Sequence, residues 1–427
     1  MHLLGIRRED KNLFEKRVPL VPDDVRALAP QTHVVIQPAP RRIFADDIYR
    51  AAGATLSEDL ESCPIILGVK EIPPQLLLAG KAYVFFSHTM KGQPQNMPML
   101  RRLLELGCTL IDYEKIVDDK GRRLVFFGRH AGLAGTIDTL WALGKRLAHE
   151  GIPTPLARLK PAYAYASLDE AKAEIAAAGR TLRAALPPNL QPLTFGVTGY
   201  GNVSSGAQEI LDLLAPRTVP PEELPRLQAA PEIYKAVFYE KHLVEPTGPD
   251  AFDLQDYYAR PERYRPVFDR YLDHLDVIVN CIYWEPRYPR LVTLEDLGRL
   301  YGGDAAPRLR VIGDITCDID GSIQANVRAT TPDNPIYVYD VQRGEGVDGV
   351  DGRGPVILAV DNLPAELPLD ASLFFSQSLR PFAPALAGAD YGAPLARSGL
   401  PPALQRATIV HRGELTEPFA YLAAHLR

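Results

Sequence analysis

The feature that most constrains the fold of this chain is a series of short apolar runs, separated by stretches long enough to form helices. The runs are PIILGVK, KAYVFFSHT, TLIDYE, LTFGVTG, DVIVNCIYW, LRVIGDIT and PVILAVDNL. Continuous apolar runs of this length are typical of strands buried on both faces of a mostly parallel sheet. One group precedes Arg129 and the other follows Gln191. We therefore expect an α/β protein with two Rossmann-like lobes, built on parallel sheets around an interdomain cleft.

The segment between the two groups predicts a connecting helix over residues 135–150. Apolar side chains recur on one face there, and Gly151 follows as a stop signal. Gly144 lies in that face, where it would let a neighbouring element approach closely. A chain of 427 residues exceeds what one hydrophobic core usually supports, so the length also favours two lobes.

Charge and composition exclude several classes of function. The net charge is −6 and no Lys/Arg run could track a phosphate backbone, so nucleic acid is not an expected partner. Because no stretch is long enough for a membrane span and the start lacks a secretory leader, we expect a cytoplasmic protein without membrane contact. The four cysteines are widely spaced and lack metal-ligand neighbours, so we expect reduced thiols and no metal site.

A glycine-rich segment, LTFGVTGYGNVSSGA at residues 193–207, predicts a nucleotide-binding loop between a strand and an amphipathic helix. Gly199 would allow the tight turn, and Gly201 would let a pyrophosphate approach the backbone at the helix N-terminus. A structural turn without a nucleotide is the alternative for this motif alone. The predicted cofactor loop is completed by Tyr200, Asn202 and Val203.

The residue that distinguishes NAD from NADP usually lies about 20 residues after the glycines, at the end of the next strand. Arg217 could bind a 2′-phosphate there, whereas Glu222 and Glu223 could accept hydrogen bonds from ribose hydroxyls. Several prolines obscure where that strand ends. We favour Arg217, and therefore NADP(H) over NAD(H).

Polar residues follow most of the apolar runs, where each predicted strand ends. Ligands of open α/β sheets bind beyond the carboxyl ends of the strands, so the convergence of these residues favours a binding site. For each residue taken singly, a capping or turn role is an equal alternative. The residues of the first group are Lys70, Glu71, His88 and Glu114. Those of the second group, expected near the cofactor, are Asn280, Asp314, Asp361 and Asn362.

Lys70 and His88 are the pair that we expect to transfer protons. Burial at a strand end lowers the pKa of a lysine toward neutrality, where histidine already titrates. A solvated turn lysine and a hydrogen-bonded core imidazole are the alternatives.

Anionic substrates would need fixed positive charge, and the planar guanidinium of arginine suits carboxylates. Glu71 and Glu114 could hold an ammonium group, or could simply pair with nearby arginines. The candidate arginines are Arg7, Arg8, Arg17, Arg122 and Arg123.

Along nearly the whole chain, the motifs resemble those of one family, the lysine-2-oxoglutarate reductase domain of the bifunctional aminoadipic semialdehyde synthases. The fungal lysine-forming saccharopine dehydrogenases are more distant relatives. The motifs are GIRRED with EKRVPLVP, ILGVKEIP, FFSHTMKGQPQNM, LIDYEKIVDDKGRR, FGRHAGLAG, LTFGVTGYGNVSSGAQ, NCIYWEPRYPRLVT, DITCDIDGSI and DNLPAELP. The family's fold, akin to alanine dehydrogenase, implies a substrate lobe of residues 1–133 with 365–427 and a nucleotide-binding lobe of residues 134–364.

The resemblance implies NAD(P)H-driven condensation of the lysine ε-amine with 2-oxoglutarate to form saccharopine, or the reverse reaction. By motif position, Lys70 and His88 match the family's acid/base pair, and Asp361 matches a position near the nicotinamide. The residues that match the substrate cleft are Arg17, Arg122 and Arg123, and those that match residues tuning it are Glu71, Lys91 and Glu114. The matching cofactor loop comprises Gly199, Gly201, Asn202 and Val203.

The chain departs from the family pattern at a few positions. Arg129 and His130 stand where the relatives have a glutamine-tryptophan pair, and Gln324 stands where an acid is expected. A different amine or 2-oxo acid is therefore left open. The relatives continue into a saccharopine-cleaving domain whereas this chain stops at Arg427, so we expect a separate dehydrogenase to process the product. A homo-oligomer is left open.

Two other functions are weighed against this one. An alanine-dehydrogenase-like enzyme would act on ammonia and a small 2-oxo acid, but such a substrate needs fewer arginines. A nucleotide-binding partner subunit, like the soluble part of a transhydrogenase, would have no need of Lys70 and His88 together.

Overall fold

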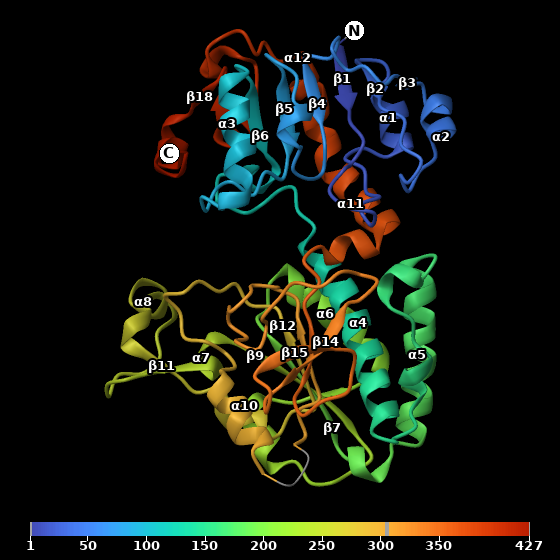
Figure 1. Cartoon of the computed structure of the whole chain (residues 1–427), viewed down its shortest axis with the longest axis vertical. Coiled ribbons are helices and arrows are strands. Elements are labelled where there is room, and N and C mark those ends of the chain that lie inside the picture. Colours follow the sequence, from blue (N-terminus) through green and yellow to red (C-terminus); the bar gives the residue numbers. More distant parts are fainter. Residues whose placement is uncertain (1, 304–306, 427) are drawn as a thin grey trace. The chain divides into compact units, whose positions relative to one another are not determined.

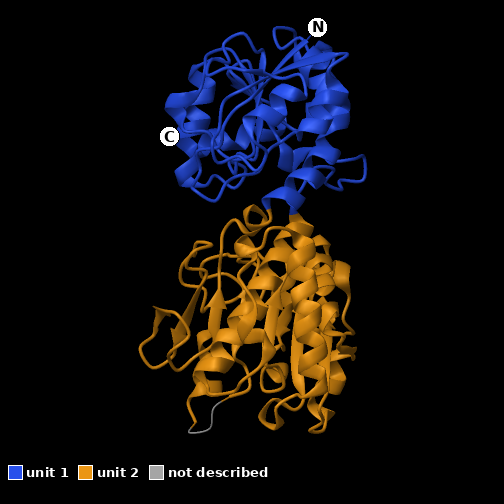
Figure 2. Cartoon of the chain, turned by 90° about the vertical axis from the view of Figure 1, so that its right-hand side faces the viewer, with its two compact units in different colours: residues 1–127, 368–427 blue, residues 128–367 orange. Residues whose placement is uncertain are grey.

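The computed structural model describes residues 2–303 and 307–426 and divides into two units (Figure 2). Unit 1 comprises Met1–Phe127 with Pro368–Arg427, and unit 2 comprises Gly128–Leu367. Each unit contains an eight-stranded, mostly parallel sheet, so the expected α/β class with two parallel sheets is confirmed. The boundaries expected at 133/134 and 364/365 lie a few residues inside the limits of unit 2.

The sheet of unit 1 has the strand order β18-β17-β6-β5-β4-β1-β2-β3, and its neighbours from β6 to β3 are parallel (Figure 1). The strands are β1 (His2–Ile6), β2 (Thr32–Ile36), β3 (Thr55–Leu56), β4 (Ile65–Leu67), β5 (Ala82–Phe85), β6 (Thr109–Asp112), β17 (Thr408–His411) and β18 (Glu414–Leu415). The helices are α1 (Pro22–Leu28), α2 (Asp46–Ala51), α3 (Met97–Glu105), α11 (Pro368–Leu379), α12 (Ala383–Gly388) and α13 (Pro402–Arg406).

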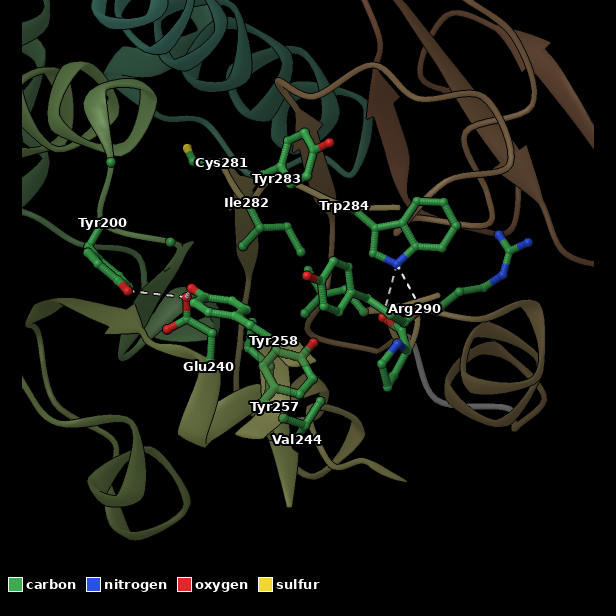
Figure 3. A pocket seen from close by; sticks show the side chains of 16 residues that line it. Tyr200, Glu240, Val244, Tyr257, Tyr258, Cys281, Ile282, Tyr283, Trp284 and Arg290 are labelled. Atoms are coloured by element: carbon green, nitrogen blue, oxygen red, sulfur yellow. Dashed lines mark hydrogen bonds between the residues drawn. The ribbon is translucent and has the colours of Figure 1, made fainter. Parts of the chain in front are cut away.

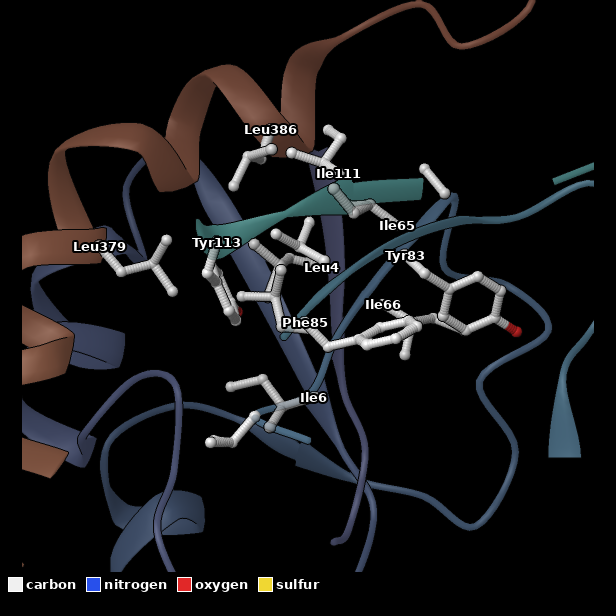
Figure 4. Close-up of a cluster of buried hydrophobic side chains, with 14 of the residues drawn as sticks. Leu4, Ile6, Ile65, Ile66, Tyr83, Phe85, Ile111, Tyr113, Leu379 and Leu386 are labelled. Atoms are coloured by element: carbon white, nitrogen blue, oxygen red, sulfur yellow. The ribbon is translucent and has the colours of Figure 1, made fainter. Parts of the chain in front are cut away.

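The C-terminal segment completes the core of unit 1. Leu379 of α11 and Leu386 of α12 are buried in the cluster that the apolar strand residues form (Figure 4). The Ser372 hydroxyl accepts a hydrogen bond from the Val18 amide at 3.1 Å, and β17 pairs with β6 in antiparallel fashion. The first lobe is therefore built from both ends of the chain.

The sheet of unit 2 has the order β15-β14-β16-β13-β12-β7-β9-β8, which is parallel from β16 to β8. The strands are β7 (Leu193–Thr198), β8 (Arg217–Thr218), β9 (Ile233–Phe238), β12 (Val277–Asn280), β13 (Val311–Asp314), β14 (Ile336–Asp340), β15 (Glu345–Asp348) and β16 (Val356–Leu358), with a separate hairpin of β10 (Val244–Pro246) and β11 (Tyr264–Pro266). The helices are α4 (Gly128–His149), α5 (Leu168–Ala184), α6 (Asn202–Leu211), α7 (Glu240–Leu243), α8 (Leu254–Ala259), α9 (Asp269–Leu272) and α10 (Leu294–Tyr301).

Helix α4 begins at Gly128, earlier than the predicted helix over residues 135–150. The additional turns pack directly on the backbone of α6. A Cβ atom on Gly132 would lie 1.9 Å from the Val203 carbonyl oxygen, and one on Gly206 would lie 2.1 Å from the Arg129 carbonyl oxygen. The two helices can therefore approach each other this closely because each has a glycine at the crossing.

Gly144 has the role that the sequence predicts for it. A Cβ atom there would lie 2.3 Å from the carbonyl oxygen of Leu156, in the segment that follows α4. The close approach that this glycine was expected to allow is confirmed.

Candidate active site

The glycine loop of unit 2 opens a cavity of about 400 Å³ (Figure 3). Gly199 has φ +82°, and its amide donates a hydrogen bond to the Phe238 carbonyl at 2.9 Å, which ties the loop to the end of β9. A Cβ atom on Gly201 would point into open space, so the backbone is accessible where α6 begins. This arrangement fits a pyrophosphate at the N-terminus of α6. The aromatic residues lining the cavity are Tyr200, Tyr257, Tyr258, Tyr283, Trp284 and Tyr288.

Glu240 is the acid of this cavity, and it lies two residues after the end of β9, the strand beside β7. Its Oε1 atom accepts hydrogen bonds from the hydroxyls of Tyr258, at 2.6 Å, and Tyr200, at 3.2 Å. An acid at the end of the strand next to the glycine strand is placed to bind the ribose hydroxyls of a dinucleotide. The sequence prediction missed Glu240 because β8 and the 3-10 helix Pro221–Arg226 intervene, which doubles the usual separation of about 20 residues.

The structure does not bring Arg217 to the glycine loop. Arg217 pairs with Tyr234 near the start of β9, whereas the loop follows the end of β7 beside Phe238. Glu222 lies 3.2 Å from the His242 ring, and Glu223 is exposed. None of the three residues considered for cofactor discrimination lines the cavity that contains Glu240.

Asn280 and Asp314 are fully buried and hold neighbouring strand ends together, where the sequence predicted contacts with the cofactor. The Asn280 amide nitrogen donates to Asp314 at 2.8 Å, and its amide oxygen accepts from the Thr198 hydroxyl at 2.8 Å. Burial raises the pKa of Asp314, although it also accepts hydrogen bonds from Thr316 and Asn326. This network joins the ends of β7, β12 and β13.

The remaining residues of the predicted cofactor site lie at the start of α6 and in the turn after β16. Asn202 and Val203 begin α6, with Asn202 exposed and Val203 half-buried. Asp361 is exposed in the turn after β16, and Asn362 is buried beside it. Asp361 does not line the cavity of about 400 Å³ that the glycine loop opens.

In unit 1, the structure brings Glu71 and His88 together at the carboxyl ends of β4 and β5, which are parallel neighbours. The Nδ1 atom of His88 lies 2.6 Å from Oε1 of Glu71, and Lys11 Nζ lies 3.3 Å from the same oxygen. Burial raises the pKa of Glu71, but the His88 hydrogen bond and the charges of His88, Lys11 and Lys70 outweigh it and lower the pKa to about 2. Glu71 is thus a carboxylate over the working range of an enzyme.

Lys70 is half-buried next to this pair. Burial lowers its pKa, and the neighbouring positive charge of Arg17 lowers it further. Its backbone amide donates to Oε2 of Glu9 at 3.0 Å, and the Val69 amide donates to Oε1 of Glu9 at 2.7 Å. Glu9, which the sequence prediction missed, therefore fixes the turn that carries Lys70, and burial raises the pKa of Glu9 to about 7.

A buried acid also anchors His88. Asp112, at the end of β6, accepts hydrogen bonds from the Ser87 amide at 3.0 Å and the Glu114 amide at 2.8 Å. The backbone of His88 has φ +47°, and its carbonyl accepts a hydrogen bond from Asn96 at 3.0 Å. Asp112 was not predicted as a site residue, although it stands beside Glu114 in the run TLIDYE.

The arginines of unit 1 that match the substrate cleft by motif position are paired with carboxylates. Arg17 is buried and donates to Glu15 through Nε, at 2.8 Å, and Nη2, at 2.5 Å. Arg122 contacts Asp118 at 2.7 Å, and Arg123 pairs with Glu114, so the pairing alternative holds for Glu114.

The structure places the remaining substrate candidates differently. The backbone amide of Lys91 donates to Gln93 at 3.1 Å, and its side chain is exposed. Arg129 of α4 pairs with Glu209 of α6 at 2.6 Å, within unit 2. Gln324 Oε1 accepts from the Leu294 amide at 3.0 Å and so caps α10. Arg129 and Gln324 have structural partners at the positions where the chain departs from the family pattern.

Two absences hold for residues 2–303 and 307–426. No group of three or more His, Cys, Asp or Glu side chains is arranged to hold a metal ion. Within the same residues, every helix is too short or too polar to cross a membrane.

The sequence of this chain matches one family model and several known proteins. Residues 5–134 match the family model "Alanine dehydrogenase/PNT, N-terminal domain". The chain is 39% identical to the alpha-aminoadipic semialdehyde synthase of Arabidopsis thaliana and 36% identical to that of Mus musculus, each over 98% of its length. It is 28% identical to the saccharopine dehydrogenase [NAD(+), L-lysine-forming] of Neurospora crassa, over 89% of this chain and 90% of that protein.

This chain is a homologue of the alpha-aminoadipic semialdehyde synthases and of the L-lysine-forming saccharopine dehydrogenases. The resemblance that the motifs indicate is confirmed. This chain spans 41% of the Arabidopsis synthase and 47% of the mouse synthase, which is less than half of each.

Solved structures show which known proteins share the fold of this chain. An L-alanine dehydrogenase superposes with a TM-score of 0.63 and 18% identity, over 100% of both chains. A transhydrogenase from Sinorhizobium meliloti gives 0.51 and 16%, over 97% of this chain and 99% of the other. The expected alanine-dehydrogenase-like fold is therefore confirmed.

Proposed function

We propose that this chain is a nicotinamide-dependent oxidoreductase that condenses the ε-amine of lysine with 2-oxoglutarate and reduces the imine to saccharopine, or catalyses the reverse. The observation that carries this proposal is the group of Lys70, Glu71 and His88 at the carboxyl edge of the unit 1 sheet. The names of the relatives support lysine and saccharopine, and the glycine loop of unit 2 supports a nucleotide cofactor.

The cluster is suited to the proton transfers of this reaction. The contact with the Glu71 carboxylate keeps a proton on Nδ1 of His88, which leaves Nε2 as a proton acceptor. Burial and the charge of Arg17 lower the pKa of Lys70, so its ammonium gives up a proton more readily than that of a solvated lysine. One of the two groups would deprotonate the attacking lysine ammonium, and the other would protonate the carbinolamine oxygen as water leaves. When bound, the cofactor supplies the hydride that the imine carbon accepts.

We further propose that the preferred cofactor is NAD(H), in place of the NADP(H) expected from Arg217. The Glu240 carboxylate can accept hydrogen bonds from both hydroxyls of the adenosine ribose, and it would repel a 2′-phosphate. Tyr200 and Tyr258 hold this carboxylate in the cavity (Figure 3).

Replacing Glu240 with Gln is expected to weaken NADH binding roughly 30-fold, because a charge-assisted hydrogen bond is lost. NADPH binding should weaken far less or improve, because the repulsion of the 2′-phosphate disappears. Fluorescence titration of both cofactors measures the ratio, and Glu223→Gln, an exposed acid outside the cavity, is the control. Tighter binding of NADPH than NADH by the unaltered protein would contradict this preference.

The activity is tested by following NADH and NADPH oxidation with 2-oxoglutarate and a panel of amines: lysine, ornithine and ammonia. The proposal predicts turnover with lysine and NADH. Turnover with ammonia alone would favour the alanine-dehydrogenase-like function, and cofactor binding without turnover for any amine would favour the partner subunit.

The same proposal includes a cytoplasmic location, although the mouse relative is named mitochondrial. A homo-oligomer stays open within it. Light scattering of the purified protein and localisation of the tagged protein test these points.

A further inference from the structure

A buried histidine closes the turn that carries Glu240. His242 is 6% exposed and lies in the short helix α7, two residues after Glu240. Its Nδ1 atom accepts a hydrogen bond from the Tyr239 backbone amide at 2.9 Å, and its own amide donates back to the Tyr239 carbonyl at 2.8 Å. Both bonds close the turn between β9 and α7.

The opposite side of the ring fixes which nitrogen carries the proton. Nε2 of His242 lies 3.2 Å from the Glu222 carboxylate, so Nε2 is the donor and Nδ1 is free to accept from Tyr239. The hydrogen bond to Tyr239 can form only while Nδ1 is unprotonated, because an imidazolium has two donors and no acceptor.

The turn that His242 closes is joined to both parts of the cofactor cavity. The Tyr239 ring stacks on Tyr200 of the glycine loop, with ring centroids 4.9 Å apart. Glu240, the next residue, receives the hydroxyls of Tyr200 and Tyr258. A shift of the Tyr239 backbone would therefore displace the stacked ring and the carboxylate together.

We propose that His242 is a positioning residue for cofactor binding: neutral His242 holds Tyr239 and Glu240 in the binding arrangement, and protonated His242 releases them. The inference rests on the proposed role of Glu240 as the ribose-binding acid. It makes cofactor binding at that site depend on pH, a dependence that the glycine loop and Glu240 do not themselves provide.

The charged surroundings determine where the histidine titrates. Burial among Phe238 and its neighbours lowers the pKa of His242, while Glu222 and Glu240 oppose this effect and Lys241 adds to it. Tyr271 of α9 packs on the same Phe238 ring. Burial and the negative charge of Glu222 raise the pKa of Tyr271, so its hydroxyl remains neutral. Since protonation is disfavoured in the folded protein, binding should be complete above pH 6.5 and be lost as the pH falls through the lowered pKa.

The test is isothermal titration calorimetry with ADP-ribose, which carries the adenosine ribose and is stable in acid. Between pH 8 and pH 5, the dissociation constant of the unaltered protein should rise, approaching tenfold for each pH unit below the pKa of His242. Titrations in buffers of different ionisation enthalpy should show proton release on binding in this range.

Two substitutions separate the acceptor from the titration. In His242→Asn, the side-chain oxygen occupies the position of Nδ1, so binding should stay within about threefold of the unaltered value at pH 8 and lose its pH dependence. In His242→Gln, the amide reaches toward Glu222 instead, and binding should weaken about fivefold at every pH because the Tyr239 amide loses its partner. Glu222→Gln, at an exposed position, should move the midpoint to lower pH.

The outcomes distinguish this inference from the proposed function. If ADP-ribose binds and the pH profiles of the unaltered protein and His242→Asn coincide, the positioning role is overturned while the cofactor site stands. An unchanged midpoint in Glu222→Gln would overturn it as well. Failure of ADP-ribose to bind at any pH would overturn the cofactor site and this inference with it.

Discussion

Replacing Lys70 with Met should lower kcat by about 10³-fold while leaving the dissociation constant of NADH within about twofold. Positioned acid–base groups contribute about 10²- to 10⁴-fold to rate, and Met retains the length of the lysine side chain without a titratable proton. The half-buried position should accept the apolar side chain with little loss of stability. Single-turnover oxidation of NADH with saturating lysine and 2-oxoglutarate measures the effect.

Lys81→Met is the matched control, because Lys81 directly precedes β5, at the end of that strand opposite to His88. It should retain the unaltered kcat. Equal losses of kcat in both variants, or a loss of NADH binding in Lys70→Met, would contradict the role of Lys70 in proton transfer.

Gly206→Ala should lower the free energy of unfolding by about 3 kcal/mol, at the high end for an added methyl group. The new Cβ atom would lie 2.1 Å from the Arg129 carbonyl oxygen and 2.9 Å from the Leu133 amide nitrogen. Both are backbone atoms of α4, so only a separation of α4 from α6 relieves the overlap. Because α6 follows the glycine loop, weaker NADH binding should accompany the loss.

Urea denaturation followed by circular dichroism measures this change, and Gly298→Ala is its control. Gly298 lies inside α10, and a Cβ atom there meets nothing within 4 Å. Since alanine is the better helix former, Gly298→Ala should be neutral or stabilise by up to about 1 kcal/mol. A stability of Gly206→Ala equal to that of the unaltered protein would show that the helices do not cross as described.

The sequence predicted the fold well because its signals are local. Each apolar run contains a strand. The segment LTFGVTGYGN forms a strand, a turn in which Gly199 has a positive φ, and the start of a helix after Gly201. The start of α4 was placed too late because GRHAGLAG contains three glycines, which disfavour a helix. Gly132 is needed at the crossing with α6 and Gly135 packs against Ile315 and Leu363, and no helical pattern reveals these tertiary contacts.

The candidate site was only partly predictable. Lys70, Glu71 and His88 converge because parallel strands end at one edge, which the pattern of runs implies. Glu240 was missed because inserted elements moved the acid along the chain, and Arg217 was chosen for its spacing alone. Asn280 and Asp314 follow strands as ligand residues do, yet they satisfy each other. A polar side chain at a strand end can bind a ligand or can hydrogen-bond a neighbouring side chain, and a sequence does not show which side chains become neighbours.

The most direct test of the proposed reaction is isotopic. The protein is incubated with lysine, 2-oxoglutarate and NADH that carries deuterium at both hydrogen positions of C4, and the amino-acid products are analysed by mass spectrometry. The proposal predicts saccharopine with one deuterium on the carbon that was the keto carbon of 2-oxoglutarate. Labelled glutamate in place of saccharopine, or no transfer of deuterium to any product, would contradict it.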